Sequence, residues 1–65
     1  MKVVLNGEER DVASQYIAGL LDELEIGSKK VAIEQNKQIV PRDSYLEALI
    51  SEGDSIEIVH FIGGG

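Results

Sequence analysis

The stretch that decides the fold lies at the end of the sequence and reads Ile56-Glu57-Ile58-Val59-His60-Phe61-Ile62-Gly63-Gly64-Gly65. Alternating apolar residues predict a β-strand from Ser55 to Phe61, and its apolar character favours the middle of a sheet, beside the first strand. Three glycines then follow. Glycine loses the most backbone freedom on ordering and has no side chain to pack. We therefore expect one domain over residues 1–61 and a flexible tail over residues 62–65.

The tail offers a slim backbone and a terminal carboxylate on Gly65. Fully extended, Ile62 to Gly65 spans roughly 13–14 Å, enough to enter a narrow cleft. A loose terminus or a remnant of cloning is the plainer alternative. We favour the interpretation that the domain presents the Gly65 carboxylate to other enzymes.

The N-terminal residues predict a hairpin. Lys2–Asn6 is rich in β-formers, Asn6-Gly7 is typical of a type I′ turn, and Glu8–Val12 returns as a polar edge strand. Alternation places Met1, Val3 and Leu5 on one face and Lys2 and Val4 on the other.

An amphipathic helix follows, with apolar residues at helical spacing: Ile17, Leu20, Leu21 and Leu24. We expect Ser14 to cap its start and Gly27 to end it. Gly19 inside the helix indicates either a close approach to the sheet or a tolerated flaw. Acidic residues near the helix end form a docking face or, more simply, a solvated one: Asp22, Glu23 and Glu25.

The remaining residues predict two short strands and a last turn. Val31–Gln35 and Gln38–Val40 are strands joined at Asn36-Lys37, and Arg42–Ser44 is a polar linker. Tyr45–Ile50 suggests one or two helical turns, and Gly53-Asp54 is a turn. The order predicts an α+β fold, a ubiquitin-like β-grasp in which a mixed sheet of four or five strands packs on one main helix.

Composition limits the function. The 65 residues carry a net charge of −6 and no cysteine. The negative charge disfavours nucleic acid and anionic membranes, and it favours a protein partner with a basic face, although it also serves solubility. With no apolar run long enough for a signal or a membrane span, we expect a cytoplasmic protein that is monomeric when free.

No motif predicts catalysis. His60 is the only histidine, and with no cysteine beside it we expect no metal site. No serine is placed as a nucleophile, and the glycines precede no helix that would make a phosphate loop. We expect His60 to be a structural or docking residue.

The outward face of the last strand is a candidate interface. Val59 and Phe61 point away from the helix if Ile56 and Ile58 face it, and Val4 would join them. Scattered apolar residues on a sheet are a common alternative.

Two segments resemble a known family: Asn36–Arg42 and, more specifically, Gly53–Gly65. The chain resembles the bacterial sulfur carriers of the thiamine pathway, the ThiS family of the ubiquitin-like superfamily, over essentially its full length. Ile62, where valine is expected, is a conservative departure.

The resemblance implies that a ThiF-type, E1-like adenylyltransferase using Mg-ATP activates Gly65. It also implies that sulfur from cysteine, through a desulfurase, converts Gly65 to a thiocarboxylate for a ThiG-type thiazole synthase. Gly64 would enter the partners' active sites with Gly65, while Gly63 belongs to the tail before them. Ile62 would join the partner-binding residues. The carrier itself would bind no cofactor.

Three alternatives stay open. Carriers for molybdopterin, cysteine or thio-tRNA synthesis also end in Gly-Gly, although the His60–Gly63 context favours thiamine. A ubiquitin-like modifier would be joined to lysines through Gly65. A plain interaction module would work without Gly64 and Gly65.

Overall fold

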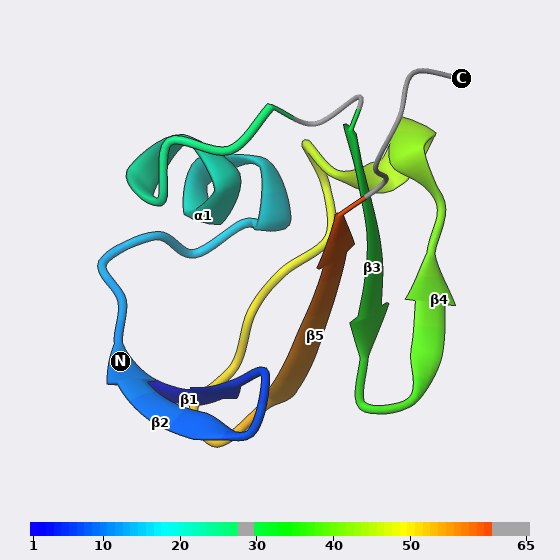
Figure 1. Cartoon of the computed structure of the whole chain (residues 1–65). Coiled ribbons are helices and arrows are strands. Elements are labelled where there is room, and N and C mark those ends of the chain that lie inside the picture. The colour runs from blue at the N-terminus through cyan, green and yellow to red at the C-terminus, as the bar shows by residue number, and fades with distance from the viewer. Residues whose placement is uncertain (28–29, 61–65) are drawn as a thin grey trace.

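The computed structural model describes residues 1–27 and 30–60, so Phe61 and the predicted tail lie outside the described residues. Within these residues, five strands and one α-helix follow one another (Figure 1). Their bounds are β1 Lys2–Leu5, β2 Glu8–Asp11, α1 Ile17–Glu23, β3 Val31–Gln35, β4 Gln38–Val40 and β5 Ser55–His60.

The strands form one mixed sheet in the order β2-β1-β5-β3-β4. β5 lies in the middle, parallel to β1 and antiparallel to β3, and β2 is an exposed edge strand. Both hairpins turn as their residues predict, with positive φ at Asn6, Gly7, Asn36 and Lys37. The α+β β-grasp prediction is confirmed, with five strands in the sheet.

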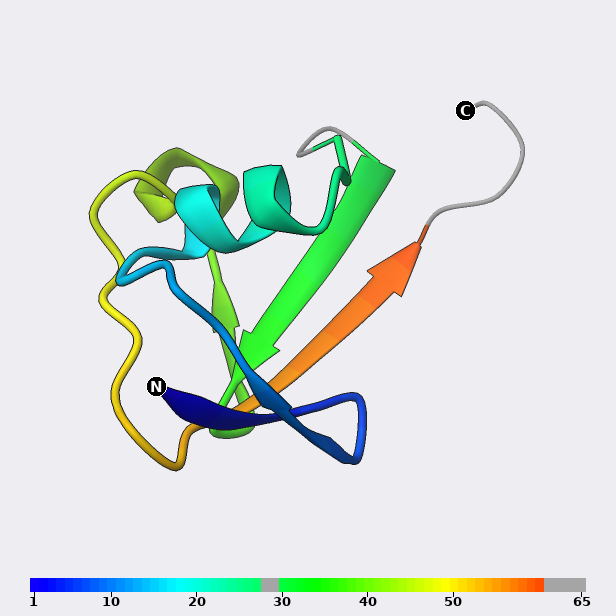
Figure 2. The ribbon, with the colours of Figure 1, turned by 90° about the vertical axis from the view of Figure 1, so that its left-hand side faces the viewer.

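One face of the sheet is covered. Figure 2 shows α1 and the segment that follows β4 on the same side of β3 and β5. The predicted helix stripe packs there, with Ile17, Leu20 and Leu21 buried and Leu24 partly buried. The core also takes alternate residues from the strands, namely Val3, Leu5, Val31, Ile33, Val40, Ile56 and Ile58.

The predicted cap of α1 is wrong. The helix starts at Ile17 after Tyr16, and no side chain caps it. Backbone carbonyls of a distant segment do so instead, because the Ile17 N–H donates to the Ala48 carbonyl at 3.0 Å and the Ala18 N–H to the Tyr45 carbonyl at 2.8 Å. The first two N–H groups of the helix are thereby satisfied without a serine.

The end of α1 also differs from the prediction. Gly27 does not terminate the helix, because Glu25 adopts the left-handed conformation with φ of 59°. Its N–H donates to the Asp22 carbonyl at 3.0 Å, and the Ile26 N–H donates to the Leu21 carbonyl at 2.8 Å. These two bonds form a Schellman motif in which glutamate occupies the position that glycine usually takes.

The segment after β4 is more ordered than a linker. Arg42–Ser44 forms a 3₁₀ helix, followed by a turn that brings Tyr45 and Ile50 into the core. Leu46 and Leu49 remain 79% and 60% exposed. The helical turn therefore begins earlier than predicted, and residues that follow it supply the carbonyls that cap α1.

A polar cluster fixes the entry into β5. The Asp54 carboxylate accepts hydrogen bonds from Asn36 Nδ2 at 3.0 Å, Gln35 Nε2 at 2.8 Å and the Ser51 N–H at 2.8 Å. Burial raises the pKa of Asp54, but these donors outweigh it and hold the pKa below its ordinary value. The cluster joins the β3–β4 turn to the turn at Gly53 and sets where β5 begins.

Candidate functional site

The end of β5 is the described part of the chain that lies nearest to the predicted functional tail. Val59 and His60 are its last two residues, and both are exposed. Ile56 and Ile58 are buried against the helix side, so His60 lies on the helix side and Val59 on the open face, as alternation predicts. Phe61, Ile62 and Gly63–Gly65 fall outside the described residues.

Val4 and Val59 share the open face of the sheet but are not neighbours. The parallel register pairs Val4 with Ser55, four residues before Val59, which at the rise of a strand is about 13 Å away. The cross-strand neighbour of Val59 is Ala32, and Val59 is 58% exposed. The open face therefore brings Val59 together with β3 rather than with Val4.

Sequence reasoning missed one apolar residue of this face. Ile39 of β4 is 75% exposed. Its register partner is Glu34 of β3, which in turn pairs with Glu57 of β5, so Glu34 lies between Ile39 and β5. Alternation in the predicted strand Gln38–Val40 could have placed Ile39 outward, since Val40 is buried. The open face is thus apolar and acidic together.

The β1–β2 turn holds the second half of β5 in place. The Asn6 N–H donates to the Ile56 carbonyl at 2.9 Å, and the Asn6 side-chain Oδ1 accepts from the Ile58 N–H at 2.7 Å. One residue of the turn thereby continues the β1–β5 pairing after β1 has ended.

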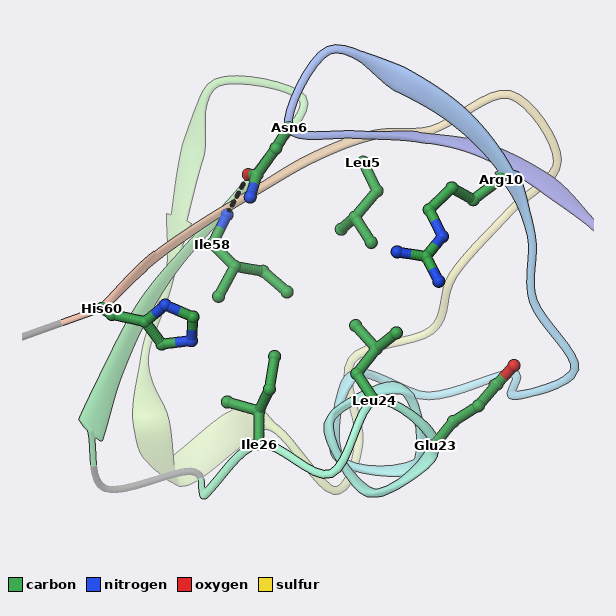
Figure 3. A pocket seen from close by; sticks show the side chains of 8 residues that line it. All are labelled: Leu5, Asn6, Arg10, Glu23, Leu24, Ile26, Ile58 and His60. Carbon is green, nitrogen blue, oxygen red and sulfur yellow. Dashed lines mark hydrogen bonds between the residues drawn. The ribbon is translucent and has the colours of Figure 1, made fainter.

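A pocket of about 390 Å³ opens beside this contact (Figure 3). Apolar side chains line it from three elements, β1, β5 and the end of the helix, namely Leu5, Ile58, Leu24 and Ile26. Four exposed polar residues complete the lining, namely Asn6, Arg10, Glu23 and His60. Beside these four exposed residues, Leu24 and Ile26 are only partly buried, so the pocket is an open groove on the helix side of the β5 end.

Glu23 at the groove is held by the loop before the helix. Its carboxylate accepts hydrogen bonds from the Ala13 N–H at 3.1 Å, and from the Ser14 N–H and Oγ at 3.2 and 3.0 Å. These donors, the Ala13 N–H above all, hold the pKa of Glu23 below its ordinary value. This acidic residue near the helix end therefore has a structural partner.

Within residues 1–27 and 30–60, no group of three or more metal-ligating side chains is close enough together to hold an ion. No helix in the same part of the chain is long and apolar enough to cross a membrane.

The chain is similar to two kinds of known protein. It is 53% identical over its full length to a thiazole synthase of Paramagnetospirillum magneticum, of which it spans only 20%. It is 43% identical over 49 residues to the sulfur carrier protein ThiS of Bacillus subtilis, an alignment that covers 75% of this chain and 74% of that protein.

A solved structure and a family model both support the similarity to ThiS. The crystal structure of the thiamine biosynthesis protein ThiS from Geobacter metallireducens superposes with a TM-score of 0.85 at 26% identity, covering both chains in full. The model of the ThiS family matches residues 3–65, which include the three glycines. This chain belongs to the ThiS family.

Proposed function

We propose that this chain is a sulfur carrier of thiamine biosynthesis, in which Gly65 carries the sulfur as a thiocarboxylate. The observation that carries the proposal is the family match, because it runs through the glycines to Gly65. The similarity to a protein named a sulfur carrier, across three quarters of this chain, supports it.

The proposed chemistry starts from an unreactive group. An α-carboxyl group has a pKa of about 3.3–3.7, so at neutral pH the Gly65 carboxylate is an anion and a poor electrophile. A ThiF-type adenylyltransferase joins it to the α-phosphorus of Mg-ATP and releases pyrophosphate. A desulfurase takes sulfur from cysteine as a persulfide, and a thiol reduces that sulfur to the sulfide level and becomes a disulfide. The sulfide then displaces AMP from the adenylate and leaves the Gly65 thiocarboxylate. ATP and magnesium belong to the activating enzyme, and this chain acts as co-substrate rather than catalyst.

Thiazole synthase is the proposed acceptor of the sulfur. Two thiazole synthases, of Paramagnetospirillum magneticum and Magnetococcus marinus, match this chain over its full length while the chain spans a fifth of theirs. A segment like this chain therefore occurs in one polypeptide with the rest of those synthases. Such joining is expected for two parts that work on the same sulfur.

The domain and the tail would have different roles. Residues 1–61 form the docking domain, and residues 62–65 enter the active sites of the enzymes. Val59, Phe61 and Ile62 would contact these partners directly beside the tail, with His60 on the helix side and Val4 further away. The net charge of −6 favours partners with a basic face. A cytoplasmic, monomeric carrier with no affinity for nucleic acid or membranes fits this role.

Intact mass tests the proposal. The chain is incubated with the adenylyltransferase, Mg-ATP, cysteine and a desulfurase. We expect a mass gain that matches exchange of one oxygen for sulfur, localised by fragmentation to Gly65. An unchanged mass with partners that thiolate a known carrier would overturn the proposal, and isopeptide adducts at lysines would identify a modifier instead.

A further inference from the structure

The groove beside β5 has the composition of a protein-docking site. Its apolar wall consists of Leu5, Leu24, Ile26 and Ile58, and its exposed rim carries Arg10 and His60 (Figure 3). A volume of about 390 Å³ exceeds that of a single large apolar side chain and lies in the range of sites that hold organic groups. An apolar wall with a polar rim is the usual anatomy of an interface anchor point.

The groove runs along a stretch of β5 that β1 does not pair. The β1–β5 register ends at Leu5 and Ile56, whereas β5 continues to His60. Asn6 continues the pairing on this edge as far as the Ile58 N–H. An extended segment of another protein could lie along the edge beyond Asn6, in line with β1, and direct one side chain into the groove.

The charge at the groove differs from that of the molecule. Acidic residues outnumber basic ones by 12 to 6, yet Arg10 projects its guanidinium into the groove from the edge strand β2 (Figure 3). Glu23, the acidic residue of the rim, is already bound by Ala13 and Ser14. Arg10 is therefore suited to a carboxylate of the partner, since a guanidinium binds a carboxylate through two hydrogen bonds.

The position of the groove indicates which partner fills it. Gly65 lies five residues after His60, so its carboxyl group is at most about 18 Å from the end of β5. An enzyme that takes Gly65 into its active site must therefore come within about 18 Å of the end of β5, where the groove opens. Among such enzymes, two thiazole synthases carry a segment like this chain in the same polypeptide.

We propose that this groove, formed by Leu5, Leu24, Ile26 and Ile58 with Arg10 at its rim, binds an extended segment of thiazole synthase. That segment places a large apolar side chain in the groove and a carboxylate against Arg10. The inference rests on the proposed function, because it takes thiazole synthase as the enzyme that receives the tail. It adds a second attachment point, on the face of β5 opposite Val59.

Charge reversal at Arg10 tests the inference with a matched control. Arg10→Glu and Lys37→Glu change the net charge equally, but Lys37 lies in the exposed β3–β4 turn, away from the groove. Binding to the thiazole synthase of the same organism is measured by calorimetry at one ionic strength. We expect Arg10→Glu to raise Kd roughly tenfold or more and Lys37→Glu to change it less than about threefold. Equal effects of the two substitutions would overturn the inference.

Methyl NMR of the wild-type chain provides a readout that needs no variant. On addition of thiazole synthase, the methyl signals of Leu24 and Ile26 should shift or broaden, while those of exposed Leu46, outside the groove, should not. Unperturbed Leu24 and Ile26 signals in a formed complex would refute the groove as the site. Perturbation by the adenylyltransferase alone would assign the groove to that enzyme and refute the occupant proposed here.

Different results would contradict the sulfur-carrier proposal and the groove proposal. If intact mass shows no thiocarboxylate on the wild-type chain, sulfur carriage fails whatever the calorimetry gives. If the wild-type chain gains sulfur but Arg10→Glu binds thiazole synthase as Lys37→Glu does, the groove proposal alone fails. Circular dichroism of both variants, with thermal unfolding, confirms that the comparison is made between folded proteins.

Discussion

Asn6 and Ile58, 52 residues apart in the sequence, are joined by a hydrogen bond of 2.7 Å from the Ile58 backbone N–H to the Asn6 side-chain Oδ1. Asn6 has φ of 49°, so the same residue forms the β1–β2 turn and secures β5 two residues before its end. The strand that leads into the tail is thereby tied to the opposite end of the chain.

Asn6→Gly should loosen β5 without breaking the turn. Glycine accepts the left-handed conformation but removes the acceptor, and a hydrogen bond of this kind contributes about 0.5–1.5 kcal/mol. We expect the Ile58 amide to exchange with solvent roughly two- to tenfold faster, as measured by NMR. Asn6→Asp keeps an oxygen acceptor and serves as the control, and equal exchange rates in the two variants would show that the bond contributes nothing.

Glu25→Gly should stabilise the protein. A residue with a side chain in the left-handed conformation costs about 1–2 kcal/mol, part of which is offset when glycine also gains freedom in the unfolded chain. We expect the free energy of unfolding in urea to rise by about 0.5–1 kcal/mol. Glu25→Gln removes the charge near the helix end but keeps the side chain, so it should recover only a few tenths of a kcal/mol. If the glutamine variant is as stable as the glycine variant, Glu25 destabilises the protein through its charge and not through its backbone conformation.

Gly19 is explained by Ser14 rather than by the sheet. A Cβ at Gly19 would lie 3.0 Å from Ser14 Oγ and 3.1 Å from Ser14 Cβ. Ser14 has little freedom to withdraw, because its N–H and its hydroxyl both donate to Glu23. Gly19→Ala should therefore bring no stability in the wild-type chain, although alanine is the better helix former by about 1 kcal/mol.

The Ser14→Gly background should reverse that result. Without the Ser14 side chain, Gly19→Ala should gain about 1 kcal/mol, and a double-mutant cycle by urea unfolding measures the difference. If the effects of Gly19→Ala and Ser14→Gly on the free energy of unfolding are additive, the contact between position 19 and Ser14 does not affect stability.

Stability should fall on the acidic side partly through Asp54. Its pKa is lowered in the folded protein, so its contribution is fully present above the unfolded value of about 3.9. The contribution is lost as the pH falls from there through the lower folded pKa. Asp54→Asn should flatten the dependence of urea-unfolding stability on pH between about pH 5 and pH 2. Profiles of equal slope for Asp54→Asn and the wild type would contradict the role of the cluster.

Local patterns predicted most of the fold, because strand alternation and the two turns depend on residues close together in sequence. The ends of α1 could not be predicted in this way. The first N–H groups of the helix donate to carbonyls about 30 residues later in the sequence. The left-handed residue that ends the helix is Glu25, although the sequence favours a glycine, and hence Gly27, for that conformation. Alternation groups Val4 with Val59 because it gives the face of a strand but not its register. The groove depends on where β1 stops beside β5, which is also a matter of register.

Gly65→Ala should abolish sulfur loading while the fold survives. The added methyl group narrows the passage for the tail and restricts the backbone angles at the reacting carbon, whereas residues 1–60 build the core without it. The intact-mass assay should show less than about 1% of the wild-type thiocarboxylate, a loss equivalent to about 2.7 kcal/mol in the reaction barrier. Gly27→Ala is the matched control, because a Cβ at Gly27 meets nothing within 4 Å. Unfolding of Gly65→Ala by circular dichroism would contradict the separation of tail and domain, and normal loading would remove Gly65 from the site.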